Sequence, residues 1–201
     1  MSKEITPYNI DNSMIVGQYK DFKLGARYSI VAPPGCEVIV ESSVGGFIRI
    51  PENENREVKE VARIWTVKKS IVGIPWAVIE VSYIDSRNSQ PAEFGANGEY
   101  SYKVLASDEI VKIFPNQEQV SIDNIKDYLK PHINPAIEKV LSARLSEYGI
   151  DMIDKLKCQE EIKGLLSSLF LTNYLALSSF TITRIIGYPN NIEGDGYAEG
   201  T

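Results

Sequence analysis

The chain has 201 residues, of which 43% are hydrophobic and 24% are charged, as in ordinary globular proteins. At this length folding buries roughly 70% of the surface of the unfolded chain, so a single domain needs no disulfide or metal to be stable. The net charge of −6 argues against nucleic acids and anionic membranes as partners, because lysine and arginine dominate the surfaces that bind them.

The first half of the sequence alternates short apolar runs with turn residues, which predicts β-strands. Pro33-Pro34-Gly35 predicts a tight corner, and Gly45-Gly46 predicts a hairpin turn. We expect six or seven strands in a curved, mostly antiparallel sheet, among them residues 29–32, 36–41, 47–50, 61–67, 74–84 and 100–105.

Alternation within three of these strands predicts which side chains share a face, since successive residues of a strand point to opposite sides. The expected shared faces are Glu37, Ile39 and Glu41 in the first; Ala77, Ile79, Val81 and Tyr83 in the second; and Tyr100, Tyr102 and Val104, facing inward, in the third. Trp65 and Trp76 lie on strands, and core packing is the expected role of both.

Helical periodicity follows. Ser107 is expected to cap a short helix that ends by Pro115, with Asp108 and Glu109 in its first turn, where negative charge suits the helix dipole. A second helix is expected to begin at a cap, Ser121.

Proline interrupts the second helix. Pro131 and Pro135 should end or kink it, because proline lacks an amide donor and clashes with the preceding turn, before the helix continues through 137–145. A third helix is expected over 151–174, with a set of apolar side chains toward the core: Ile153, Leu156, Ile162, Leu165, Leu166 and Leu169. Residues 179–186 alternate as a last strand, and 189–201 are expected to form a flexible tail.

These phrases, taken in order, resemble the SPFH (band-7, stomatin/prohibitin-like) superfamily, and most closely its virion core protein-like branch. The similarity covers residues 12–188. The segments that carry it are the strand and Pro-Pro-Gly corner at 29–35, Ile-Trp-Thr-Val-Lys-Lys at 64–69, Gly-Glu-Tyr-Ser-Tyr-Lys-Val at 98–104 with the acidic helix start 107–109, and the closing helix, turn and strand.

The resemblance implies a scaffold. Many superfamily members assemble into rings or cages on membranes, using an apolar N-terminal segment and a long C-terminal coiled coil. This sequence shows neither pattern, so we expect an isolated core domain that binds other proteins or copies of itself.

Catalytic and metal-binding patterns are weak by comparison. The single histidine, His132, is interpreted as a helix-end residue that interacts with nearby carbonyls, with a catalytic base as the alternative. Gly194-Asp195-Gly196 lacks the regular oxygen ligands of a calcium loop. The acidic residues Glu52, Glu54, Glu57 and Glu60 are expected to keep a loop solvated, and the two cysteines, Cys36 and Cys158, to be buried and unpaired.

The sequence therefore predicts an α+β fold, with an N-terminal extension over 1–11, a single SPFH-like domain over 12–188 and a tail over 189–201. The expected function is a non-enzymatic scaffold, cytoplasmic or peripheral to a membrane through a partner, without cofactor or metal. The alternatives are a phage or virion structural protein and a small hydrolase or ligand-binding enzyme with a dispersed site.

Self-association or a protein partner is expected to use the helix 122–145 and the strand 179–186. The candidate interface residues are Ile122, Ile125, Leu129, Ile137, Leu141, Leu145, Phe180, Ile182 and Arg184.

Overall fold

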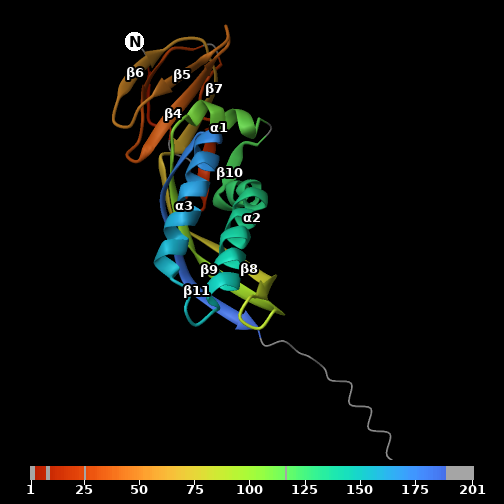
Figure 1. Cartoon of the computed structure of the whole chain (residues 1–201). Coiled ribbons are helices and arrows are strands. Elements are labelled where there is room, and N and C mark those ends of the chain that lie inside the picture. The colour runs from red at the N-terminus through yellow and green to blue at the C-terminus, as the bar shows by residue number, and fades with distance from the viewer. Residues whose placement is uncertain (1–2, 8–9, 25, 116, 189–201) are drawn as a thin grey trace, which may run out of the picture.

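The structure confirms the α+β class. It is a computed structural model that describes residues 3–7, 10–24, 26–115 and 117–188, so the expected tail, with Gly194-Asp195-Gly196, lies outside the described residues (Figure 1). The strands are β1 (Lys3–Ile5), β2 (Met14–Tyr19), β3 (Tyr28–Val31), β4 (Cys36–Ser42), β5 (Phe47–Ile50), β6 (Asn55–Val58), β7 (Val61–Lys68), β8 (Ser70–Asp85), β9 (Gln90–Val104), β10 (Gln119–Ser121) and β11 (Leu175–Tyr188). The helices are α1 (Ser107–Ile113), α2 (Ile122–Tyr148) and α3 (Lys155–Thr172).

The strands form three sheets where one curved sheet was expected. Their orders are β1-β3-β6, β10-β2-β7-β4-β5 and β11-β9-β8. Neighbouring strands are antiparallel except β1 and β3, which are parallel. Strand β1 falls in the segment expected to be an N-terminal extension, and its pairing with β3 makes Lys3–Ile5 part of a sheet.

Strand β4 is buried on both faces, and the predicted alternation of Ile39 with Val38 and Val40 holds along it. Val38 and Val40 belong to a cluster enclosed by the N-terminal strands, whereas Ile39 belongs to the larger cluster that continues under α2 and α3. Glu37 is buried as well and pairs with Lys69 at 3.3 Å. Because a carboxylate is rarely buried without a partner, this ion pair accounts for its place in the strand.

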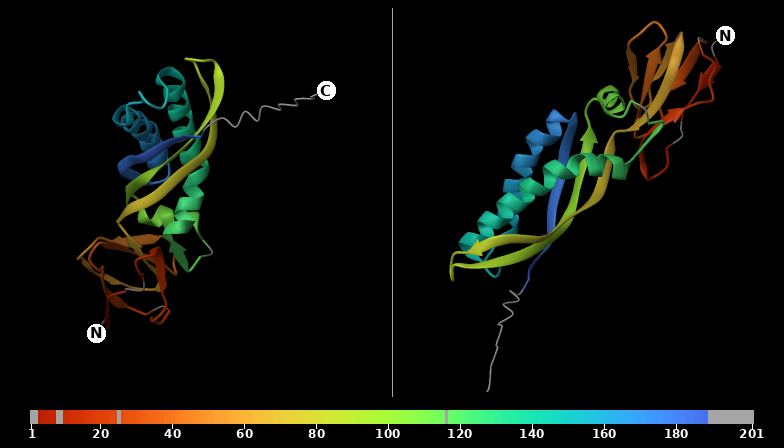
Figure 2. Two further views of the ribbon diagram at one scale, coloured as in Figure 1. Left: turned by 90° about the horizontal axis from the view of Figure 1, so that it is seen from below. Right: turned by 90° about the vertical axis from the view of Figure 1, so that its right-hand side faces the viewer.

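The long strands β8, β9 and β11 form a ribbon, and α2 and α3 pack against one of its faces (Figure 2). Tyr100, Tyr102 and Val104 of the central strand β9 point into this core, as predicted. Phe170 of α3 packs against both tyrosines, with ring centroids 5.7 and 5.9 Å apart. The aromatic pairs join the central strand to the helix that covers it.

The buried face of β8 differs from the prediction along part of the strand. Trp76 and Val78 are buried, whereas Ala77 and Ile79, expected to share a face with the buried Tyr83, are exposed. The register against β9 shifts between Val78 and Val81, and Glu80 there has φ of 54°. A bulge of this kind exchanges the two faces of a strand, so the alternation cannot hold across it.

Helix α2 is continuous through both of its prolines. The predicted cap is confirmed: Ser121 Oγ accepts a hydrogen bond from the Asn124 amide at 3.1 Å, and Asn124 Oδ1 accepts one from the Ser121 amide at 2.8 Å. Pro131 and Pro135 lie on the exposed side of the helix, and the helix changes direction along its length (Figure 2). Proline thus bends the helix and does not end it.

Helix α1 begins one residue earlier than predicted and joins the two halves of the chain. Its N-cap is Ala106, and Ser107 is a buried first-turn residue without a capping hydrogen bond. Asp108 forms an ion pair with Arg49 of β5, and Lys112 lies over the ring of Phe47 at 5.2 Å from its centre. The acidic first turn therefore contacts the five-stranded sheet as well as suiting the helix dipole.

Helix α3 is shorter than predicted, with Asp154 as its N-cap. Ile162 and Leu166 face the core as expected, but Leu156 and Leu165 are exposed. The core positions are completed by Cys158 and Phe170, which the predicted stripe did not include.

The side chain of Trp76 crosses the ribbon from β8 to β11, a contact we call the Trp76 bridge. Its indole Nε1–H donates a hydrogen bond to the Thr181 carbonyl of β11 at 3.2 Å, and its ring stacks on Phe180 with centroids 5.1 Å apart. Gly98 of β9 lies between them. A Cβ at this glycine would come within 1.9 Å of the Thr181 oxygen and 2.9 Å of the Trp76 ring, so the crossing needs a residue without a side chain.

We expect Gly98→Ala to lower the free energy of unfolding by at least about 2 kcal/mol, since overpacking costs roughly 1–3 kcal/mol and the bridge hydrogen bond is lost too. Gly164→Ala is the matched control, because nothing lies within 4 Å of its Cβ position in helix α3. This control should raise the free energy of unfolding by about 0.5–1 kcal/mol, from helix propensity. Urea unfolding measures both, and equal stability of the two variants would contradict the role of Gly98.

Candidate functional site

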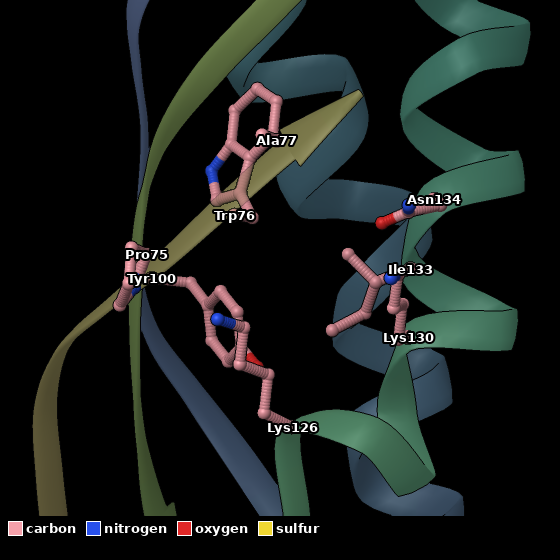
Figure 3. A pocket seen from close by; sticks show the side chains of 8 residues that line it. All are labelled: Pro75, Trp76, Ala77, Tyr100, Lys126, Lys130, Ile133 and Asn134. Atoms are coloured by element: carbon pink, nitrogen blue, oxygen red, sulfur yellow. The ribbon is translucent and has the colours of Figure 1, made fainter. Parts of the chain in front are cut away.

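A cavity of about 170 Å³ lies between the edge strand β8, the central strand β9 and helix α2 (Figure 3). It is lined by Pro75, Trp76, Ala77, Tyr100, Lys126, Lys130, Ile133 and Asn134. The Trp76 bridge and the core residue Ile133 hold its walls in place.

The buried polar group at this cavity is the hydroxyl of Tyr100. The residue is 2% exposed, and its hydroxyl has no hydrogen-bond partner among the described residues. Figure 3 shows its ring directed from β9 toward α2. Burial raises the pKa of Tyr100, so the hydroxyl stays protonated at neutral pH and is able to donate a hydrogen bond.

Helix α2 contributes a row of polar side chains at intervals of four residues: Lys126, Lys130 and Asn134. Side chains spaced in this way lie above one another on the same side of a helix. Neither lysine forms an ion pair within the described part of the chain. Two cationic amines and an amide therefore face the cavity without competing partners.

A second, more open hollow, which we call the extension, shares Pro75, Trp76, Ala77 and Lys126 with the cavity. Asn97, Glu99 and Thr183 line this extension, together with Lys126. Among the residues that line the cavity and the extension, Glu99 is the one acidic residue, and it is exposed. Positive charge therefore exceeds negative charge around the cavity.

The lining offers hydrogen-bond donors and apolar surface. Tyr100, Lys126, Lys130 and Asn134 all donate, while Pro75, Trp76 and Ile133 supply apolar walls. No group of three metal-binding side chains occurs among the described residues. The arrangement suits binding of an acceptor-bearing ligand.

The predicted catalytic candidates lie elsewhere. His132 is an exposed residue within α2, not at its end, and it lines neither the cavity nor its extension. In the segment expected to be an acidic loop, Glu52 accepts a hydrogen bond from the Gly35 amide at 2.6 Å. Glu57 lies on strand β6, not in a loop, and pairs with Arg27 at 3.3 Å. These carboxylates stabilise turns and strand contacts at the surface.

The candidate interface residues lie mainly in the core of the chain itself, which corrects their proposed availability to a partner. The buried ones are Ile125, Leu129, Ile137, Leu141, Leu145, Phe180 and Ile182. Ile122 is partly buried against the same core, and Arg184 is exposed. The apolar stripe of α2 thus covers the ribbon and is not free for a second molecule.

The sequence interpretation missed the cavity residues of α2. Their signal was present as the spacing of Lys126, Lys130 and Asn134 along one side of the apolar stripe, but such a row is typical of the solvated border of a helix face. The two tryptophans and both cysteines are buried, as predicted. What the sequence could not reveal is that β8 runs beside this row.

No protein-family model matches the sequence, and a search of curated proteins finds no similar relative. The SPFH resemblance therefore stays a prediction. Among the described helices, none combines the length and the hydrophobicity that crossing a bilayer requires.

Tyr100 and Tyr102 should make the protein less stable at alkaline pH. Burial raises the pKa of both, so above pH 10 the unfolded chain releases a proton that the folded protein keeps. The free energy of unfolding then falls as pH rises, by about 1 kcal/mol per tyrosine between pH 10 and 11.

Urea unfolding of Tyr100→Phe and Tyr102→Phe at both pH values tests this expectation. Each variant should lose about 1 kcal/mol of the pH-dependent decrease, because phenylalanine has no proton to release. A decrease as large as that of the unsubstituted protein in either variant would show that the tyrosine ionises normally in the folded state.

Proposed function

We propose that the chain is a non-enzymatic assembly domain that self-associates through the exposed face of strand β8. The supporting observation is a set of large apolar side chains exposed along this one strand: Val72, Ile79 and Ile84, at 79%, 70% and 55% exposure. Each adjoins a buried residue of the same strand, so each projects away from the helices.

The length of this surface favours a protein partner. From Val72 to Ile84 the strand extends about 40 Å at about 3.3 Å per residue, which is the scale of a protein interface and not of a small ligand. The exposed Pro75 and Ala77 lie between them and continue the apolar character. Exposed apolar surface of this extent on an edge strand promotes association.

The geometry favours packing of faces over extension of the sheet. Pro75 lacks an amide donor, and the register of β8 shifts at two points, between Ile71 and Ile74 and between Val78 and Val81. Proline and bulges oppose the addition of a further strand at an edge. Two copies related by a twofold axis bury the same residues on both sides, which gives a closed dimer.

This proposal keeps the scaffold expectation and moves its surface from the apolar stripe of α2 to β8. It places the protein in the cytoplasm, where the free, buried Cys36 and Cys158 stay reduced, with any membrane contact made through a partner. A closed dimer is the outcome expected of a scaffold subunit; an open polymer would favour the particle-forming alternative.

The double variant Val72→Lys/Ile79→Lys should convert the self-associated protein to monomer, raising the dissociation constant at least about tenfold, because charge is forced against an apolar interface. Light scattering over a wide concentration range measures the mass of each protein.

The matched control is Val44→Lys, which changes a valine of 77% exposure in the turn between β4 and β5. It should associate like the unsubstituted chain. A monomer at every concentration without any substitution, or an equal loss of association in the control, would refute the proposed surface.

A further inference from the structure

We propose that the cavity between β8, β9 and α2 binds a small organic monocarboxylate, a function that does not rest on self-association, although Pro75 and Ala77 border both sites. The ligand class follows from three features of the lining: its hydrogen-bonding groups, its charge and its shape.

The hydrogen-bonding groups require a ligand that accepts. The Tyr100 hydroxyl is buried and has no partner among the described residues, which costs about 1–3 kcal/mol when nothing accepts its proton. Lys126 and Lys130 donate and have no acceptor capacity. Asn134 contributes an amide, whose carbonyl accepts, as the Tyr100 hydroxyl oxygen also can, so donors outnumber acceptors among these four side chains.

The charge of the lining selects an anion. Two lysines one helical turn apart face the same space, and Glu99 in the shallow extension is the carboxylate near them. Asp123 and Asp127 lie on the same helix, but they line neither the cavity nor the extension. A bound carboxylate satisfies both amines and the tyrosine hydroxyl through charge-assisted hydrogen bonds.

The shape of the cavity selects a compact hydrocarbon body. Pro75 and Trp76 form one wall and Ile133 forms part of the opposite one, as Figure 3 shows. Inorganic phosphate leaves these apolar surfaces in contact with water. The volume of about 170 Å³ is small beside the roughly 300–1,000 Å³ of pockets for drug-sized ligands, so the ligand is limited to one ring or a short chain.

Cyclohexanecarboxylate is a suitable probe, with cyclohexanecarboxamide as its neutral counterpart and inorganic phosphate as an anion without a hydrocarbon body. Two-dimensional NMR of the ¹⁵N-labelled full chain reports binding through the indole N–H of Trp76, assigned with a Trp65→Phe variant. We expect a saturable shift with a dissociation constant on the order of 1 mM, as for a ligand of this size. The carboxamide and phosphate should bind at least tenfold more weakly.

Two variants test the polar groups. Lys126→Gln/Lys130→Gln should weaken binding of the carboxylate at least tenfold, and Tyr100→Phe about fivefold or more. Their matched controls are Lys139→Gln, an exposed lysine of the same helix, and Tyr102→Phe. Tyr102 has the same buried, unpartnered hydroxyl on the same strand but does not line the cavity, so both controls should bind within twofold of the unsubstituted chain.

If Tyr100→Phe alters folding, the double variant Lys126→Gln/Lys130→Gln still tests the site, because its lysines are not core residues. Equal affinity for the carboxamide would overturn the charge argument, and equal affinity for phosphate would overturn the argument from the apolar walls. A shift that does not saturate, or one that persists in both variants, would overturn the site itself. Because these variants leave Val72, Ile79 and Ile84 unchanged, light scattering of the same samples separates failure of this proposal from failure of self-association.

Discussion

The ribbon of β8, β9 and β11 depends on one side chain that spans all three strands. Trp76 leaves β8, passes over Gly98 of β9 and donates to the Thr181 carbonyl of β11. Strand-to-strand hydrogen bonds alone leave long strands free to twist, whereas a bulky ring held at both ends fixes their relative position. Since the same ring forms a wall of the cavity, the element that orders the sheet also shapes the candidate site.

The parts of the fold that the sequence predicted are those with an uninterrupted pattern. Tyr100, Tyr102 and Val104 alternate without a break, so their burial follows from period two. Ser121 and Asn124 form a cap whose partners are three residues apart. In both cases the information lies within a few neighbouring residues, and the fold follows the local preference.

Prediction failed where distant segments decide the outcome. The bulge near Glu80 exchanges the faces of β8, and no residue type at that point predicts a bulge. Strand β4 is buried on both sides because a second cluster of strands covers it, which its own alternation could not reveal. The apolar stripe of α2 was interpreted as an interface for the same reason: an amphipathic helix covers its own sheet as readily as a partner.

Tyr100 and Tyr102 of β9 both have a buried hydroxyl without a hydrogen-bond partner among the described residues, but only one of them supports the argument for a ligand. Each costs stability that phenylalanine would not, and each lies in the same aromatic cluster with Phe170. At Tyr100 a bound ligand could offset this cost, because the residue lines a cavity with two lysines that form no ion pair among the described residues. At Tyr102 nothing in the described structure accounts for it. Stability alone therefore explains neither tyrosine, and the difference between them is the cavity.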